Sequence, residues 1–266
     1  MQADALRIRH PRAGDEQHHH ESRPRLGADL KTQLDFNCDL GEGCGDDAAI
    51  IPLLSSANIA CGFHAGDAAT MHDTVALCRR HGVAIGAHPS FPDREGFGRR
   101  EMKVNREEVT ALVLYQTGAL KAFLDAEQMP LSHIKPHGAL FGMAQRDEAI
   151  ADGIAEAALH CGVPVIAYSD CAMSEVFTRR GVPFTCEFYA DLDYDDHGRQ
   201  VITKEHAPVA PEAAAAKVLR AVRDGLTRSL GGKDVKVVAE SICVHSDTPG
   251  ALEVAKAVHA AIADRL

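Results

Sequence analysis

The fold is indicated most clearly by ANIACGFH, residues 57–64, a short apolar run that ends in a histidine beside small residues. The same pattern recurs in AIGAHP (84–89), HIKPHG (133–138) and SICVHSD (241–247), whereas LDFNCDLGE (34–42) ends in carboxylates. In α/β barrels and open α/β sheets, the loops that follow successive buried strands hold the chemistry. The repeated pattern therefore predicts an enzyme.

Strand-like and helix-like segments alternate along the chain from Leu34 onward. We expect strands at 34–39, 56–61, 83–88, 132–137, 163–168, 182–188 and 240–245, and helices at 70–81, 107–126, 147–160, 211–230 and 249–266. About seven β-then-α units in one unbroken series favour a parallel sheet with crossover helices. This α/β series predicts a single barrel, closed or nearly closed, with a doubly wound open sheet as the alternative.

Residues 1–33 differ from the rest of the chain in having little apolar clustering. They contain six basic residues and three consecutive histidines at 18–20. Such a segment buries too little surface to offset its ordering entropy, so we expect a disordered N-terminal extension. The histidines could hold a metal weakly, although a solvated tail is the simpler interpretation. The remaining 34–266 are then one domain.

Composition limits the classes of partner. The formal charge of −10 argues against nucleic acid, which needs a clustered basic surface. No apolar stretch reaches the roughly 18 residues of a membrane span. Eight scattered cysteines without a Cys-x-x-Cys pair fit a reducing compartment, and we expect the cytoplasm.

The first two strand ends offer several polar candidates. Alternation places Asn37 and Asp39 on one strand face, with Asp39 nearest the mouth of a barrel; a turn-capping role for Asp39 is the alternative. Asn58 lies in the second strand, and His64 follows it. A lone histidine is usually a structural hydrogen-bonding residue, but four histidines at four strand ends predict convergence on one mouth.

The later strand ends add charge. The loop after His88 carries Arg99 and Arg100 and could close over a substrate, where arginine would pair with a carboxylate or phosphate. Lys135 and His137 project on one side of their strand, and a partly desolvated lysine can hold a carboxylate, polarise a carbonyl or act as a base.

The last strand end carries a histidine and an acid. His245 and Asp247 follow this strand, and Asp247 could orient the imidazole or cap the next helix. Asp and His residues from several strand ends would also suit a divalent metal ion, although no local His-x-x-x-His spacing supports one.

The longest motifs resemble those of the LamB/YcsF family. The matching stretches are DFNCDLGE (35–42), SANIACGFHAGD (56–67), GAHPSFPD (86–93), GFGRR (96–100), KPHGAL (135–140), AD (190–191) and ICVHSDTPGAL (242–252), in family order. The resemblance implies a (β/α) barrel of the glycoside hydrolase/deacetylase type. It also implies ATP-dependent opening of 5-oxo-L-proline to L-glutamate, with ATP as co-substrate and B and C subunits as partners, and leaves a homo-oligomer open.

Site roles follow from the motifs and the resemblance together. The expected catalytic residues are Asp39, His64, Lys135, His137 and His245, as proton carriers, orienting groups and anion holders. The expected substrate-binding residues are Asn37, Glu42, Asn58, His88, Arg99, Arg100, Asp191 and Asp247. Two alternatives remain: a metal-dependent hydrolase or deacetylase that acts alone on a related amide or carbohydrate, and a non-catalytic scaffold or carrier subunit.

Overall fold

The computed structural model describes residues 33–201 and 207–266. The expected N-terminal extension, residues 1–33, lies outside the described residues except for residue 33. Its three histidines are therefore not described. No helix in the described part of the chain is long and apolar enough to cross a membrane.

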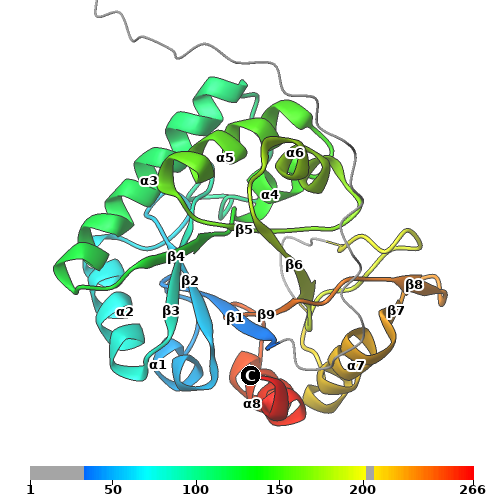
Figure 1. Ribbon diagram of the computed structural model, residues 1–266. Coiled ribbons are helices and arrows are strands. Elements are labelled where there is room, and N and C mark those ends of the chain that lie inside the picture. Colours follow the sequence, from blue (N-terminus) through cyan, green and yellow to red (C-terminus); the bar gives the residue numbers. More distant parts are fainter. Residues whose placement is uncertain (1–32, 202–206) are drawn as a thin grey trace, which may run out of the picture. The chain divides into compact units, whose positions relative to one another are not determined.

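Seven parallel strands close into a barrel that lies at the centre of Figure 1, with helices packed around its outside. In barrel order they are β1 (Asp35–Leu40), β2 (Ser56–Ala60), β3 (Ala84–His88), β4 (Leu131–Ile134), β5 (Val165–Ala167), β6 (Phe184–Tyr189) and β9 (Ser241–His245). The last strand, β9, pairs with both β1 and β6 and so closes the circle. The barrel prediction is confirmed, and the open-sheet alternative is wrong.

Helices connect the strands, as right-handed crossovers between parallel strands require. They are α1 (Asp47–Ile50), α2 (Ala68–His81), α3 (Arg106–Ala126), α4 (Gly138–Ala144), α5 (Glu148–Cys161), α6 (Ala172–Arg180), α7 (Pro211–Asp224) and α8 (Ala251–Ile262), with short 3₁₀ turns at Ile51–Leu53 and Ala263–Arg265. Local chemistry sets their ends. The Asp67 side chain accepts from the Thr70 amide at the start of α2, and Asn105 forms a capping box with Glu108 at the start of α3.

The helices predicted over 211–230 and 249–266 differ most from the observed ones. The helix expected over 211–230 ends at Asp224, because Gly225 takes a left-handed conformation (φ 65°). The chain then forms an antiparallel pair, β7 (Leu226–Arg228) with β8 (Asp234–Lys236). The helix expected from Pro249 begins at Ala251 and has Gly250 as its N-cap, so Pro249 precedes the helix.

The barrel lumen contains a polar network where an apolar core is more usual. Asn37 Nδ2 donates to Glu187 Oε1 (3.0 Å) and Ser241 Oγ (2.7 Å). Asn58 Nδ2 donates to Asn37 Oδ1 (2.7 Å). The Oδ1 atom of Asn58 accepts from His133 Nε2 (2.6 Å). Buried polar groups are stable only when paired, and this network pairs them across β1, β2, β4, β6 and β9.

Candidate functional site

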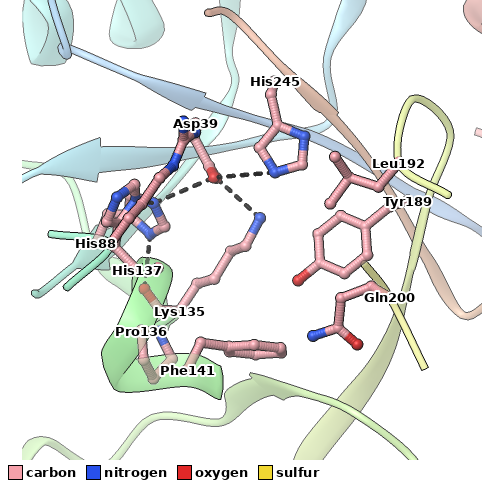
Figure 2. Close-up of a pocket in the computed structure, with 12 residues that line it drawn as sticks. Asp39, His88, Lys135, Pro136, His137, Phe141, Tyr189, Leu192, Gln200 and His245 are labelled. Atoms are coloured by element: carbon pink, nitrogen blue, oxygen red, sulfur yellow. Dashed lines mark hydrogen bonds and ion pairs between the residues drawn. The ribbon is translucent and has the colours of Figure 1, made fainter. Parts of the chain in front are cut away.

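A cavity opens at the carboxyl ends of the barrel strands (Figure 2). Its lining combines charged, imidazole and aromatic side chains: Asp39, His88, Arg99, Lys135, Pro136, His137, Gly138, Phe141, Tyr189, Leu192, Gln200 and His245. Parallel barrels place their active sites at this end. The prediction that Asp39, His64, Lys135, His137 and His245 meet at one mouth agrees with this lining for four of them; His64 contacts Glu42 and does not line the cavity. The chemical roles of all five stay predictions.

Lys135 is a buried cation held between carboxylates. Its Nζ lies 2.8 Å from Asp39 Oδ1 and 3.0 Å from Glu187 Oε1. Burial opposes the ammonium form, but Asp39, Cys243 and Glu187 raise the pKa of Lys135 well above its usual value. Lys135 therefore suits the role of a fixed positive charge better than that of a base.

Asp39 stays ionised at the centre of the site. Burial alone would raise its pKa, yet His88 and Lys135 hold the pKa of Asp39 well below its usual value. Figure 2 shows this carboxylate facing His88, Lys135 and His245. A carboxylate with such a low proton affinity orients its neighbours more readily than it accepts a proton.

His245 is oriented by Asp191, which comes from the loop after β6. Asp191 Oδ1 lies 2.9 Å from His245 Nδ1, and its Oδ2 accepts from the His245 amide (2.8 Å) and from Thr248 Oγ1 (2.9 Å). Burial opposes the imidazolium, but Asp191 and Asp39 raise the pKa of His245 to about 9. At neutral pH this side chain is thus a proton donor.

Asp247 does not perform either function considered for it from sequence. Its carboxylate lies 2.7 Å from Arg99 Nη2, whereas Asp191 orients the histidine and Gly250 caps α8. The Arg99 guanidinium also lies 5.0 Å from the centre of the Phe97 ring. The Arg99–Asp247 pair joins the loop after β3 to the loop after β9.

Glu42, His64, His88 and His137 form a second buried cluster beside Asp39. Glu42 Oε1 lies 2.9 Å from His64 Nε2. Burial lowers the pKa of His64 to about 3 and that of His137 well below 6.5, the latter with help from His64 and His88. Burial, and then Asp39, raise the pKa of Glu42 to about 8.

The loop after β3 lies against the cavity wall. Phe97 O accepts from His137 Nε2 (2.8 Å), and Gly98 O accepts from the Ala139 amide (2.9 Å). Gly98 has φ 66°, and a Cβ there would lie 2.1 Å from Ser90 Oγ, so only glycine fits this approach. The loop therefore packs tightly against the cavity wall, and closure over a substrate stays a prediction.

Of the predicted substrate-binding residues, His88 and Arg99 line the cavity, whereas Asn37, Glu42, Asn58, Arg100, Asp191 and Asp247 do not. The predicted catalytic residue His64 does not line it either. Asn37 and Asn58 are fully buried in the lumen network below it. Arg100 lies at the surface, where its side chain is 62% exposed and pairs with Asp93. A substrate contact for the residues outside the lining stays a prediction that the lining does not support.

Several residues in the lining or in contact with Lys135 were assigned no role from the sequence. Glu187 and Tyr189 alternate along β6 and so share its inner face, a signal that was available. Cys243 has its Sγ 3.0 Å from Lys135 Nζ but looks like a small core residue in the sequence. Gln200 reaches the cavity from a long loop, and no local pattern indicates it.

Comparison with known proteins identifies the family. The model of the LamB/YcsF family matches residues 34–265. The chain belongs to the LamB/YcsF family. All the motifs from which the resemblance was inferred lie within this match.

LamB/YcsF relatives match along nearly their whole length. A protein of Pseudomonas aeruginosa named as an A subunit of 5-oxoprolinase is 44% identical over 86% of this chain and 94% of its own. The "Lactam utilization protein lamB" of Emericella nidulans is 42% identical over the same shares. A crystal structure of a lactam utilization protein from Thermus thermophilus superposes with a TM-score of 0.81 at 42% identity, covering 87% of this chain and 96% of that one.

Proposed function

We propose that this chain is the A component of an ATP-dependent 5-oxoprolinase, which opens the lactam of 5-oxo-L-proline to give L-glutamate. The observation that carries the proposal is the 44% identity to the Pseudomonas aeruginosa 5-oxoprolinase component over 94% of that relative's length. The cavity supports it, because Lys135, His245 and Arg99 line a small space with hydrogen-bond donors that could contact the lactam, its carboxylate or a phosphoryl group.

The proposed chemistry breaks the bond between the lactam carbonyl carbon and its nitrogen. Transfer of the terminal phosphoryl group of ATP to the carbonyl oxygen, with release of ADP, would make this stable amide open to attack by water. Departure of the nitrogen would then leave an acyl phosphate, which a second water hydrolyses to L-glutamate and phosphate. His245, protonated and held by Asp191, would donate the proton that the leaving nitrogen needs. Lys135 and Arg99 would attract the substrate carboxylate and the phosphoryl oxygens.

Nucleotide binding is proposed to require the partner subunits. The sequence contains no Gly-x-x-x-x-Gly-Lys-Ser/Thr loop to cradle phosphates. We therefore propose that B and C subunits contribute the ATP site and that this chain supplies the lactam-opening cavity. The eight cysteines, all of them described and all free, fit a cytoplasmic setting for such a complex.

The test is glutamate release from 5-oxoproline and ATP, with this chain alone, with candidate B and C subunits alone, and with all three. We expect release that depends on this chain only in the full mixture. His245→Gln should lower the rate by about 100-fold or more, as for loss of a general acid. His72→Gln, on the exposed face of α2, is the matched control and should match wild type. Absence of glutamate from the full mixture would reject the proposal.

A further inference from the structure

We propose that Glu42, His88 and His137 form a binding site for a divalent transition-metal ion, with zinc as the first expectation. Glu42 follows β1, His88 ends β3 and His137 follows β4, so three separate strand ends contribute one donor each. All three side chains are buried, and two of them line the cavity. The inference concerns binding alone and does not depend on the proposed reaction.

Backbone carbonyls fix the tautomers of the two histidines. His88 Nδ1 lies 2.7 Å from Lys135 O, and His137 Nε2 lies 2.8 Å from Phe97 O. A carbonyl oxygen only accepts, so each of these ring nitrogens must carry the hydrogen. In the neutral rings, His88 Nε2 and His137 Nδ1 therefore carry lone pairs. Metal-binding histidines are held in the same way, with the second ring nitrogen donating to a carbonyl or carboxylate.

The two lone pairs and a carboxylate oxygen converge on one point. His88 Nε2 and His137 Nδ1 lie 2.9 Å apart, and Glu42 Oε1 lies 3.4 Å from His137 Nδ1 and 3.8 Å from His88 Nε2. Three acceptors at such distances repel one another unless a cation lies between them. In a tetrahedral zinc site with bonds of about 2.0–2.1 Å, the ligand atoms lie about 3.4 Å from one another. The three distances between these donor atoms, 2.9, 3.4 and 3.8 Å, lie on both sides of that value.

His64 is excluded as a ligand to the same ion. Its ring is stacked on that of His137, with centroids 3.8 Å apart and an angle of 9° between the planes. Imidazole lone pairs lie in the ring plane, so one ion cannot lie in the planes of two stacked rings. His64 instead contacts Glu42 Oε1 and holds that carboxylate in place. Two histidines and one glutamate are a known catalytic zinc set, which keeps a fourth position for water or substrate.

A proton is the competing occupant. Either an imidazolium at His88, which would pair with Asp39 Oδ2 at 3.1 Å, or a protonated Glu42 carboxyl group would also relieve the repulsion. The experiment separates the two. The full chain carries His18, His19 and His20, so these are changed to alanine to remove other imidazole ligands. The protein is treated with a chelator, dialysed and titrated with Zn²⁺ by calorimetry, and Co²⁺ is added in parallel to record its visible d–d bands.

We expect one Zn²⁺ per chain and the Co²⁺ bands of a tetrahedral site. Glu42→Gln and His137→Asn should weaken binding by more than about 100-fold, because loss of outer-shell partners alone costs about 10–100-fold. His259→Gln is the matched control, since this histidine also contacts a carbonyl, Leu53 O, but lies outside the cluster. It should bind zinc like the parent, and circular dichroism checks that each variant is folded.

X-ray absorption of the zinc-loaded parent protein keeps the proposal testable if a variant fails to fold. We expect two imidazole ligands and oxygen donors at about 2.0–2.1 Å. No zinc binding, stoichiometric binding that survives both substitutions, or a spectrum with sulfur or with three or more imidazoles would overturn the site.

Discussion

At the scale of the residue, Lys135 shows how one buried charge organises its surroundings. Its ammonium group pairs with both Asp39 and Glu187, which are almost completely buried. Lys135→Met should lower the free energy of unfolding by about 3–5 kcal/mol, since it leaves buried carboxylates without a counter-charge. Urea denaturation measures the loss. Lys121→Met, which removes an exposed pair with Asp125, should change stability by less than about 0.5 kcal/mol. Equal effects of the two variants would contradict this account.

His245 provides a residue-scale prediction about pH. Its pKa is about 9 in the folded protein and 6.5 ordinarily, so the folded state binds the proton more tightly. The stability it contributes is present below pH 6.5 and is lost as pH rises through 9. The shift corresponds to about 3 kcal/mol. We expect the wild type to be more stable than His245→Gln, and the difference in free energy of unfolding to be larger at about pH 6 than at about pH 10. A constant difference between the two proteins would refute the raised pKa.

At the scale of the element, helix α7 anchors the loop that carries Asp191. Lys217 Nζ on α7 donates to the carbonyls of Ala190 and Leu192. Lys217→Met removes this donor, so Asp191 should orient His245 less well. We expect the His245 pKa, followed by NMR titration, to fall towards its ordinary value, with a loss of about 1–3 kcal/mol in stability. Lys256→Met on the exposed face of α8 should leave that titration unchanged; an unchanged titration in Lys217→Met would rule out the anchoring role.

Elements with strong local signals are the ones that the sequence predicts well. The barrel strands stand out because apolar runs end in polar residues, and Asp67 and Gly82 mark the ends of α2. The β7–β8 pair was missed because LTRSL, residues 226–230, continues the helical pattern, and only the left-handed Gly225 ends it. Helix α4 was missed because seven residues are too few for a periodic signal.

The candidate site was predictable as a set of residues but not as a set of pairs. That histidines and acids meet at one mouth follows from parallel topology alone. The acid that orients His245 is Asp191, which follows β6, whereas His245 ends β9. The two residues are 54 positions apart in the chain. Sequence proximity favoured Asp247, whereas the folded structure supplies Asp191. Pairings of this kind are fixed by tertiary packing.

At the scale of the whole molecule, polar contacts across the lumen link strands of the barrel that are far apart in the sequence. Asn58 is the central link, because its side chain on β2 contacts Asn37 and Asp39 from β1 and His133 from β4. Asn58→Ala would leave buried donors and acceptors without partners, each costing about 1–3 kcal/mol. We expect a loss of about 2–5 kcal/mol by urea denaturation.

The matched control for the lumen network is Asn105→Ala, which removes an exposed helix cap on α3 and should cost about 1 kcal/mol. Both variants delete the same amide, so their difference reports the surroundings of that amide and not its chemistry. If Asn58→Ala costs no more than Asn105→Ala, water has entered the lumen to satisfy the orphaned groups. The direct contacts of Asn58 would then not be what joins β1, β2 and β4, and the position of Asp39 would depend on Lys135 and His88.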